Sequence, residues 1–563
     1  NQPMYSSDGR FILVFNGEIY NFEELKKELK FYPFKSHSDT EVIIASYIKW
    51  GKECTSKFNG MFAFAIWDKQ EKELFCSRDR FGIKPFYFYK SFNTFIFSSE
   101  IRALAACPAV ETALDPLRLP EYLESQTVSA PNTILKNIFV LEPGTSISLK
   151  KGQLVKKTYW KPDNFFSQND DSYDAACKNI KNLFMESVER QMIADVSLGA
   201  FLSGGIDSSG VVAAMSSVSS KRIKTISVNF DEKKFSEERY SDLISKKFNT
   251  DHYKISMTAN DLLDYLPEAL ESIDHPTGDG INTYIVSKAT KERGINVALS
   301  GLGGDELFAG YNVFNRMNTI RRLSWLRKIP NSAKGPISSA ASMLPSGPHV
   351  QKTLDLFNLN NFTFENVYSI MRRVIPHLEI KSLLDVSNLT QSEHSHKLID
   401  GDIFDLKDSK NFLSMVSKAE MSSYMVNTLL RDSDQMSMSS SLELRVPFLD
   451  HKLVEYVLSV KDSYKINKKI PKKLFVDSMG ELLPNEVVNR PKMGFVFPWE
   501  LWLKTNLRNF AYFHINNLSK REEFNSKKLK GYFEDYLEGK KDISWSRIWH
   551  LIVLDHWLEQ NSL

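Results

Sequence analysis

Residues 201–210 combine glycine, serine and aspartate in a pattern that could bind phosphate. The segment follows an apolar run, residues 196–202, that is typical of a buried strand, and it precedes residues 211–215, which are typical of a helix start. Glycines let the backbone approach an anion, while serine hydroxyls and free helix N–H groups can donate to its oxygens. No lysine occupies this loop, so it differs from the GxxxxGK[ST] phosphate loop. The phosphate-binding groups that we expect are Ser203, Gly204, Gly205, Ser208 and Ser209.

Aspartates in two such loops could add a metal site. Asp207 lies in the first loop, and a second glycine-rich segment, residues 300–306, follows another apolar run and carries Asp305. Carboxylates are good ligands for Mg²⁺, so Asp207 and Asp305 could hold one ion on a triphosphate. Two simpler alternatives stay open. The first loop could be an ordinary glycine-rich turn, and Asp305 and Glu306 could cap a helix N-terminus.

Further motifs extend this pattern towards the end of the chain. With both loops they stand in the order found in the glutamine-dependent asparagine synthetase family, which the chain resembles over essentially its whole length. The first loop also resembles the pyrophosphate loop, SGGxDS, of ATP pyrophosphatases. The motifs that carry the resemblance, besides the first loop, are residues 300–311, 431–438, 443–450 and 483–495.

The resemblance implies a reaction in two stages, with ATP and Mg²⁺ as cofactors. A carboxylate attacks the α-phosphorus of ATP to give an acyl-adenylate and pyrophosphate, and ammonia then displaces AMP to form an amide. Lys472 best matches the lysine that the family places against the developing charge. Lys469 and Lys473 stand close by, and a run of lysines is also typical of a solvated face. The implied adenosine pocket consists of Leu202, Val228, Ser300 and Gly301.

The acceptor carboxylate is less well defined by the sequence. L-aspartate, giving asparagine, is our first expectation. Leu302 stands where asparagine synthetases proper commonly carry an acidic residue, and residues 274–284, expected near the acceptor, differ from the common form. Leucine cannot take a proton, so a sugar uronate or another carboxylate, as amidated by relatives in surface-polysaccharide biosynthesis, is an alternative. A catalytically silent scaffold or regulatory relative is another, although two loops with metal-competent aspartates argue against it.

The first part of the chain resembles the glutamine pocket of class II amidotransferases. The matching segments are residues 15–21 and 36–41. By resemblance, Asn16 and Gly17 supply an oxyanion hole. Glu18 lines the pocket, and Asp39 pairs with the α-ammonium of glutamine. Taken alone, Asn-Gly is also typical of a hairpin turn.

The glutaminase of this family uses an N-terminal cysteine whose own amine is the base. The sequence begins with Asn1, and its cysteines all lie well inside the chain. We therefore expect a family member without its first several dozen residues, which uses ammonia and does not hydrolyse glutamine. The cysteines are Cys54, Cys76, Cys107 and Cys177.

The pattern of elements predicts how these groups are positioned. Residues 1–160 are rich in short β-type runs with two helical patterns, which favours a layered α/β domain with antiparallel sheets, Ntn-hydrolase-like and incomplete at its start. A polar linker is expected over residues 161–171. From there, residues 175–563 alternate strands and helices and then become mostly helical beyond residue 312. This alternation predicts a doubly wound parallel sheet, an ATP-pyrophosphatase domain with a helical extension, whose ligands lie at the strand carboxyl ends.

Bulk composition restricts the partners. The 563 residues are 42% hydrophobic and 25% charged, with 72 basic and 69 acidic side chains and a net charge of +3. This balance gives no reason to expect nucleic acid or a membrane as a partner. Apolar runs are too short to span a bilayer, and no Cys/His spacing suggests zinc. We expect a cytoplasmic enzyme acting on small molecules; the oligomeric state stays open, with a homodimer as one alternative.

Overall fold

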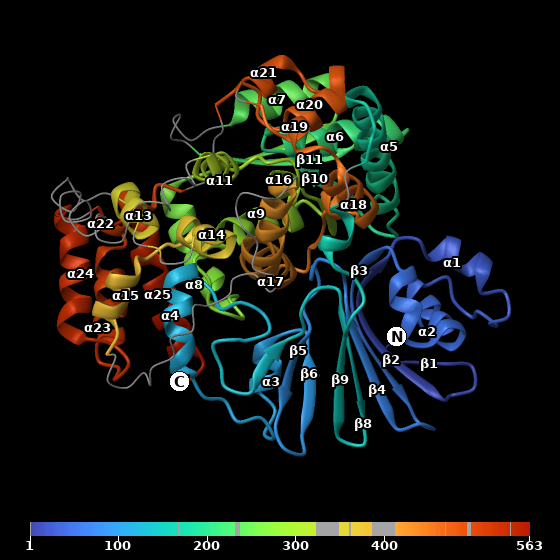
Figure 1. The fold of residues 1–563 in the computed structure, drawn as a ribbon, viewed down its shortest axis with the longest axis horizontal. Helices are drawn as coiled ribbons and strands as arrows, with labels where there is room; N and C mark the ends of the chain where they lie inside the picture. Colours follow the sequence, from blue (N-terminus) through green and yellow to red (C-terminus); the bar gives the residue numbers. More distant parts are fainter. Residues whose placement is uncertain are drawn as a thin grey trace.

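A computed structural model describes residues 2–563 except for several gaps, which are residues 167–168, 231–236, 323–347, 358, 360–361, 386–410, 468, 492–496 and 541. Part of the predicted linker, the end of the last motif at residues 492–495 and the predicted breaks near residues 335–347 lie outside the described residues. Figure 1 shows strands β1–β6, β8 and β9 in the lower part of the view, a second layer of strands and helices above them, and a group of helices at the left.

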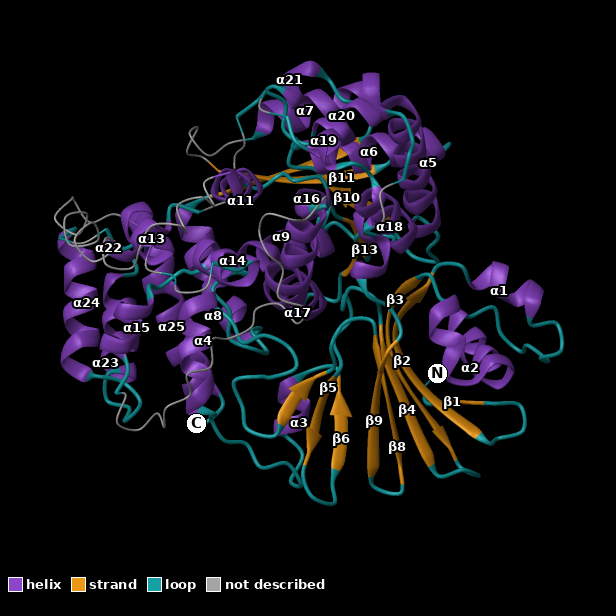
Figure 2. Cartoon of the chain, in the orientation of Figure 1, coloured by secondary structure: helices purple, strands orange, loops and turns teal. Residues whose placement is uncertain are grey.

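The N-terminal part is built on two antiparallel sheets. One has six strands in the order β1-β2-β3-β4-β8-β9, and the other has three in the order β6-β5-β7. These strands appear in orange in the lower half of Figure 2. Their bounds are β1 Met4–Tyr5, β2 Phe11–Ile19, β3 Gly60–Asp68, β4 Glu73–Arg78, β5 Tyr87–Lys90, β6 Phe95–Ser98, β7 Ile138–Val140, β8 Thr145–Lys150 and β9 Gln153–Thr158.

Side chains that alternate along β3 create two cores. Phe62, Phe64 and Ile66 face the helices that cover the large sheet. Ala63 and Ala65 face the small sheet. This period of two is what a strand buried on both faces requires. The result is a layer of helices, a large sheet and a small sheet, as predicted for an Ntn-hydrolase-like domain.

The second half contains a parallel sheet of five strands in the order β12-β11-β10-β13-β14. Leu299 faces one helical layer, whereas Ala298 next to it faces a small apolar cluster on the other side. Parallel strands are normally buried on both faces in this way. The predicted fold class, antiparallel sheets followed by a parallel sheet, is confirmed. The strands are β10 Leu198–Phe201, β11 Lys224–Phe230, β12 Asp251–Met257, β13 Val297–Leu299 and β14 Glu443–Arg445.

Helices cover the parallel sheet and form the extension at the left of Figure 1. A π-helical segment, Met421–Leu430, lies between α16 and α17. The α-helices are α1 Phe22–Glu28, α2 Asp39–Trp50, α3 Ile101–Ala105, α4 Leu119–Ser125, α5 Tyr173–Gln191, α6 Ile206–Val218, α7 Glu238–Lys247, α8 Ala259–Glu271, α9 Ile281–Glu292, α10 Gly304–Leu307, α11 Asn312–Arg322, α13 Pro348–Phe357, α14 Phe364–Arg372, α15 His377–Leu383, α16 Phe412–Glu420, α17 Arg431–Ser439, α18 His451–Ser459, α19 Asp462–Lys465, α20 Lys473–Met479, α21 Asn485–Val488, α22 Trp499–Lys504, α23 Arg508–Leu518, α24 Ser526–Glu538 and α25 Trp545–Gln560.

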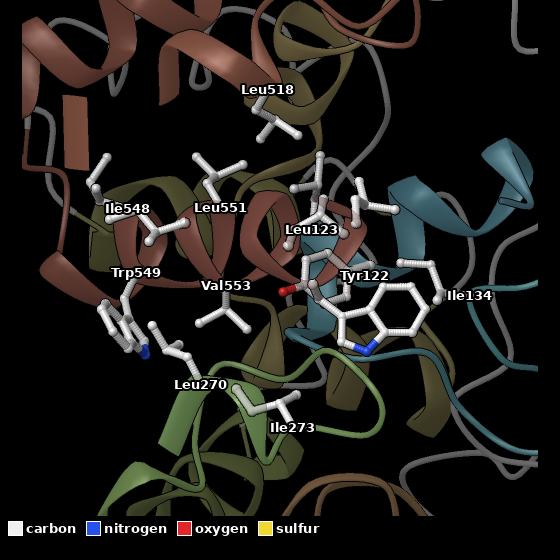
Figure 3. Close-up of a cluster of buried hydrophobic side chains, with 14 of the residues drawn as sticks. Tyr122, Leu123, Ile134, Leu270, Ile273, Leu518, Ile548, Trp549, Leu551 and Val553 are labelled. Carbon is white, nitrogen blue, oxygen red and sulfur yellow. The ribbon is translucent and has the colours of Figure 1, made fainter. Parts of the chain in front are cut away.

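The largest apolar cluster joins segments far apart in the chain. Tyr122 of α4, Leu270 of α8 and Trp549 of α25 meet in it, as Figure 3 shows. The Tyr122 hydroxyl donates to the carbonyl of His550 at 2.7 Å. The N-terminal part and the last helix are therefore packed into one core. Among the described residues, no helix combines the length and the apolar character that crossing a membrane requires.

One expectation about the elements needs correction, and one short strand adds to what the sequence indicates. The helix after the first loop begins at Ile206, so Asp207 and the two following serines lie in its first turn and not in the loop. Residues 443–445 form the fifth strand of the parallel sheet, although the region beyond residue 312 reads as mostly helical. A three-residue strand has too little period to be recognised locally, and its pairing with β13 defines it.

Candidate functional site

The two glycine-rich loops lie side by side at one edge of the parallel sheet. Strand β10 pairs directly with β13, with Ala200 opposite Leu299, so both strands end at the same place. A side chain added at Gly301 would lie 2.8 Å from the Cβ of Asp207. Neighbouring strands with glycines at their ends allow this close approach. The sequence-based expectation that the loops face each other is met.

Hydrogen bonds of serine hydroxyls fix the conformation of the first loop. Ser203 Oγ lies 3.1 Å from Ser208 Oγ and accepts from the Gly205 amide at 3.3 Å. Gly204 has φ +69°, and a Cβ there would lie 2.6 Å from Tyr240. Ser209, also predicted to bind phosphate, is buried. Serine hydroxyls and the first amides of α6 thus surround the loop, as an oxyanion requires.

Lys472 joins the two loops through ion pairs. Its ammonium pairs with Asp207 and lies 2.6 Å from Asp305 Oδ1. Lys472 is 6% exposed, so the alternative of a solvated lysine does not hold for it, whereas Lys473 points its partly exposed side chain towards Asp477. Burial opposes the charge on Lys472, but the two carboxylates outweigh it and raise the pKa of the lysine.

The backbone and neighbours of Lys472 fix this arrangement. Lys472 has φ +51°, a left-handed conformation that a non-glycine residue keeps only when its surroundings impose it. A Cβ at Gly310 would collide with Asp305 and Lys472. Asp305 and Glu306 lie in the first turn of α10, where acidic side chains are favoured, but the N-cap residue is Gly303 and no side chain makes a capping hydrogen bond. Two carboxylates that converge on one cation are a donor set that also fits Mg²⁺.

Glu306 and Arg490 complete the surroundings of the loops. Glu306 is buried, which raises its pKa to about 7, and it accepts from the Tyr311 hydroxyl at 3.0 Å. Arg490 lies 2.6 Å from Glu237 and within 3.4 Å of the Cβ position of Gly205. Its Nη1 is buried without a hydrogen-bond partner among the described residues. The motif around Arg490 is visible in the sequence, but only the fold brings this guanidinium to the first loop.

The residues expected around adenosine surround the same strand ends. Leu202 is fully buried in the core, so only its backbone can face a ligand. Its amide donates to the carbonyl of Ile226 at 2.8 Å, which ties it to β11, the strand that carries Val228. The Ser300 amide donates to the carbonyl of Arg445 at 2.8 Å. Leu202 follows β10, Val228 lies in β11 and Ser300 follows β13. The three residues therefore lie towards the carboxyl ends of neighbouring parallel strands.

The predicted glutamine pocket lies on the antiparallel sheet. Asn16, Gly17 and Glu18 belong to β2, so the hairpin alternative is wrong. Gly17 has φ +139°, and a Cβ there would lie 2.8 Å from Phe62 Cα, which leaves room only for glycine. The Asn16 side chain donates to Ser99 Oγ at 3.3 Å, a partner that the sequence pattern does not indicate.

Two carboxylates dominate the charge of this pocket. Asp39 accepts from the Ile19 amide at 2.9 Å, next to Glu18 on β2. Burial raises the pKa of Asp39 and raises that of Glu18 to about 7. Arg445 from the parallel sheet lies 3.4 Å from Glu18. The pocket is thus suited to a ligand with a positive group.

A separate cavity of about 460 Å³ lies among helices α4, α9, α22 and α25 and the π-helical segment. It includes Asp279, within the segment expected near the acceptor. Arg372 lines it, and its guanidinium lies 4.3 Å from the ring of Tyr424 and 5.2 Å from that of Tyr311, which bonds to Glu306. The cavity is therefore linked to the loop of Asp305. Other lining residues are Gln126, Asn282, Asn427, Trp499, Trp545 and Trp549.

Comparisons with known proteins agree with these features. The Asparagine synthase family model matches residues 179–559, and the Glutamine amidotransferase domain model matches residues 1–160. Asparagine synthetase [glutamine-hydrolyzing] 1 of Bacillus subtilis is 30% identical, over 99% of this chain and 86% of its own length. Asparagine synthetase [glutamine-hydrolyzing] 3 of the same organism is 31% identical, over 88% of this chain and 77% of its own length.

A more distant relative is Amidase chry2 of Gibberella zeae, 26% identical over 89% of this chain and 79% of its own length. The sheets, the two loops and these matches agree. The chain belongs to the asparagine synthetase family of ATP-dependent amidotransferases.

Proposed function

We propose that this protein is an ATP-dependent amide-forming ligase that activates a carboxylate as its adenylate. The observation that carries the proposal is Lys472, held between Asp207 and Asp305 at the ends of two parallel strands. Mg²⁺, when bound by the two aspartates, would neutralise charge on the triphosphate. Residues 175–563 would form the ligase domain and residues 1–160 the glutamine domain.

In the first stage, an acceptor oxygen bonds to the α-phosphorus while the bond to the pyrophosphate oxygen breaks. Charge then gathers on the departing pyrophosphate, where the loop hydroxyls, the amides of α6 and Arg490 can donate hydrogen bonds. Lys472 stabilises the developing charge, because a fixed cation in a buried site costs little reorganisation. In the second stage, ammonia bonds to the acyl carbon, AMP leaves and the nitrogen loses a proton.

We propose that the ligase stage of this chain uses ammonia, and that glutamine binds at the pocket on β2. Asn16 and the Gly17 amide would hold the oxygen of its side-chain amide. Glu18 and Asp39 would meet the α-ammonium, and the buried acidic character of the pocket supports this. The resemblance and the glycine-only position at residue 17 support the same placement.

L-aspartate is the acceptor that the names of the relatives favour. A sugar uronate or another larger carboxylate is the second candidate, because the 460 Å³ cavity exceeds what aspartate needs and three tryptophans line it. Flat aromatic faces suit sugar rings, and Arg372 would meet a carboxylate. Leu302 removes an acidic group from the same loop.

ATP–pyrophosphate exchange with a panel of carboxylates tests the proposal. We expect exchange that requires Mg²⁺ and one class of carboxylate. Exchange with uronates but not with aspartate would select the second candidate. Absence of exchange with every carboxylate would contradict the ligase function and favour a regulatory or scaffold role.

A further inference from the structure

The backbone of Arg445 is hydrogen-bonded to the second glycine-rich loop, residues 300–306. It is the last residue of β14 and stands opposite Leu299, the last residue of β13. Its carbonyl accepts the Ser300 amide at 2.8 Å, so its position helps to fix where the loop begins. The loop then continues to Asp305 and the ion pair with Lys472. A shift of Arg445 would therefore move the start of this loop.

The side chain of Arg445 reaches the other site. Its Nη2 lies 3.4 Å from Glu18 Oε1, and the guanidinium lies 5.6 Å from the ring of Tyr20. Both partners belong to the predicted glutamine pocket or the residues just after it. Arg445 is thus a single residue with direct contacts to both halves, one through its carbonyl and one through its guanidinium.

Other contacts leave the guanidinium little freedom. It donates to Glu443 Oε1 at 2.7 Å and to the carbonyls of Gln191 at 2.8 Å and Ile193 at 2.5 Å. The side chain is 2% exposed, so its charge depends on these partners and on Glu18. A planar group held by this many bonds can transmit a change at Glu18 to the end of β14.

We propose that Arg445 is a positioning residue that couples occupancy of the glutamine pocket to nucleotide binding at the loop of Ser300. The inference rests on the proposed function, since it assumes that glutamine binds beside Glu18. Without glutamine, Glu18 pairs with Arg445. When the α-ammonium of glutamine binds, Glu18 interacts with two cations, and its ion pair with Arg445 weakens. Each ligand then alters the affinity for the other by the same factor.

Titration calorimetry on the full chain tests the coupling. The dissociation constant of Mg²⁺ with α,β-methylene-ATP, which cannot release pyrophosphate, is measured without and with saturating L-glutamine. We expect at least a fivefold change in wild type, the lower range of measured couplings. In Arg445→Met the ratio should fall to about one. Arg445→Lys keeps the charge but cannot make all the contacts of the guanidinium. Its ratio should therefore lie between those of wild type and Arg445→Met.

Glu455→Ala is the matched control. Glu455 accepts the indole N–H of Trp160 at 2.8 Å, another contact between the two halves, in which neither Glu18 nor Ser300 takes part. This variant should keep the wild-type ratio. If Arg445 were only a structural link, both Arg445 variants would lose thermal stability but retain the ratio, which would overturn the inference.

Two further outcomes separate this inference from the proposed function. Glutamine and nucleotide that both bind wild type without affecting each other would overturn the coupling alone. Failure of wild type to bind glutamine at all would overturn the glutamine pocket and the coupling together. If Arg445→Met does not fold, the Arg445→Lys ratio decides, because a value equal to wild type would contradict the role of these contacts.

Discussion

The two glycine-rich loops and the proposed glutamine pocket on β2 differ in how their buried charges are balanced. In the loops, Asp207 and Asp305 share the ammonium of Lys472, so the free protein already holds a balanced charge cluster. In the pocket, burial raises the pKa values of Glu18 and Asp39, and Arg445 offsets only part of the rise at Glu18. The first cluster is balanced without a ligand, whereas the proposed pocket would gain a cation from the α-ammonium of glutamine.

The two sites also differ in the elements that support them. The loops stand at the ends of parallel strands, where the chain leaves the sheet and can place side chains from distant segments together. The pocket lies within β2, where backbone groups and one glycine set the shape. Damage to the loops should therefore affect activity more than damage to single side chains of the pocket.

Gly310→Ala should cause the largest loss. A methyl group there collides with Asp305 and Lys472, so the charge cluster must move. We expect ATP–pyrophosphate exchange to fall by about 100-fold or more, as for other losses of fixed transition-state contacts. Gly531→Ala in α24 is the matched control, since nothing lies within 4 Å of its Cβ position. Equal exchange in the two variants would show that the cluster does not control activity.

Asp305→Asn removes one of the two carboxylates from the cluster. The Mg²⁺ concentration for half-maximal exchange should rise by about tenfold or more, the range seen when metal surroundings are altered. Asp477→Asn serves as control, because Asp477 pairs with the neighbouring Lys473 and not with Lys472. An unchanged Mg²⁺ requirement in Asp305→Asn would remove Asp305 from the metal site.

The pocket should show a pH dependence instead. Burial raises the pKa of Glu18 to about 7, with Asp39 and Glu443 adding to the rise. Arg445 and Lys84 oppose it. The carboxylate that pairs with glutamine forms above this pKa, so affinity should increase from pH 6 to pH 8 by about tenfold. Calorimetry at both pH values checks this, and Glu18→Gln should flatten the profile. An equally steep profile in Glu18→Gln would assign the titration elsewhere.

Ser99→Ala should have the smallest effect. It removes the single hydrogen bond that Asn16 makes to Ser99 Oγ, at 3.3 Å. Loss of one such bond corresponds to about a twofold to tenfold weaker affinity for glutamine. Ser98→Ala is the neighbouring control, because Ser98 Oγ accepts from the Glu100 amide at 3.3 Å, whereas Asn16 donates to Ser99. A larger loss in Ser98→Ala would contradict the placement of Asn16 in the oxyanion hole.

The sequence predicted those features of the fold and of the candidate site that depend on the local hydrophobic period and on the order of the motifs. The alternation of strands and helices was enough to place the loops near Asp207 and Asp305 at the carboxyl ends of neighbouring parallel strands. The Asn-Gly-Glu motif around Gly17 predicts a glutamine pocket, and the structure places it within β2. These features follow from neighbours in the chain, for which hydrophobic period and glycine spacing carry the information.

Contacts between distant segments could not be predicted in the same way. Lys472 could be matched to a motif, but its burial between two aspartates more than 160 residues away follows only from tertiary packing. Arg490 at the first loop and Arg445 at Glu18 are similar cases. The start of α6 at Ile206 was missed because glycine and serine look like a turn, although the free amides of the first helical turn serve the same purpose.

Exchange of labelled pyrophosphate into ATP by wild type, Lys472→Met and Lys473→Met tests the adenylation site most directly. Lys472 pairs with both Asp207 and Asp305, whereas Lys473 pairs with Asp477, so the two variants remove the same charge one residue apart. We predict carboxylate-dependent exchange in wild type and Lys473→Met, and a loss of about 100-fold or more in Lys472→Met. Equal exchange in Lys472→Met and wild type would contradict the proposed site.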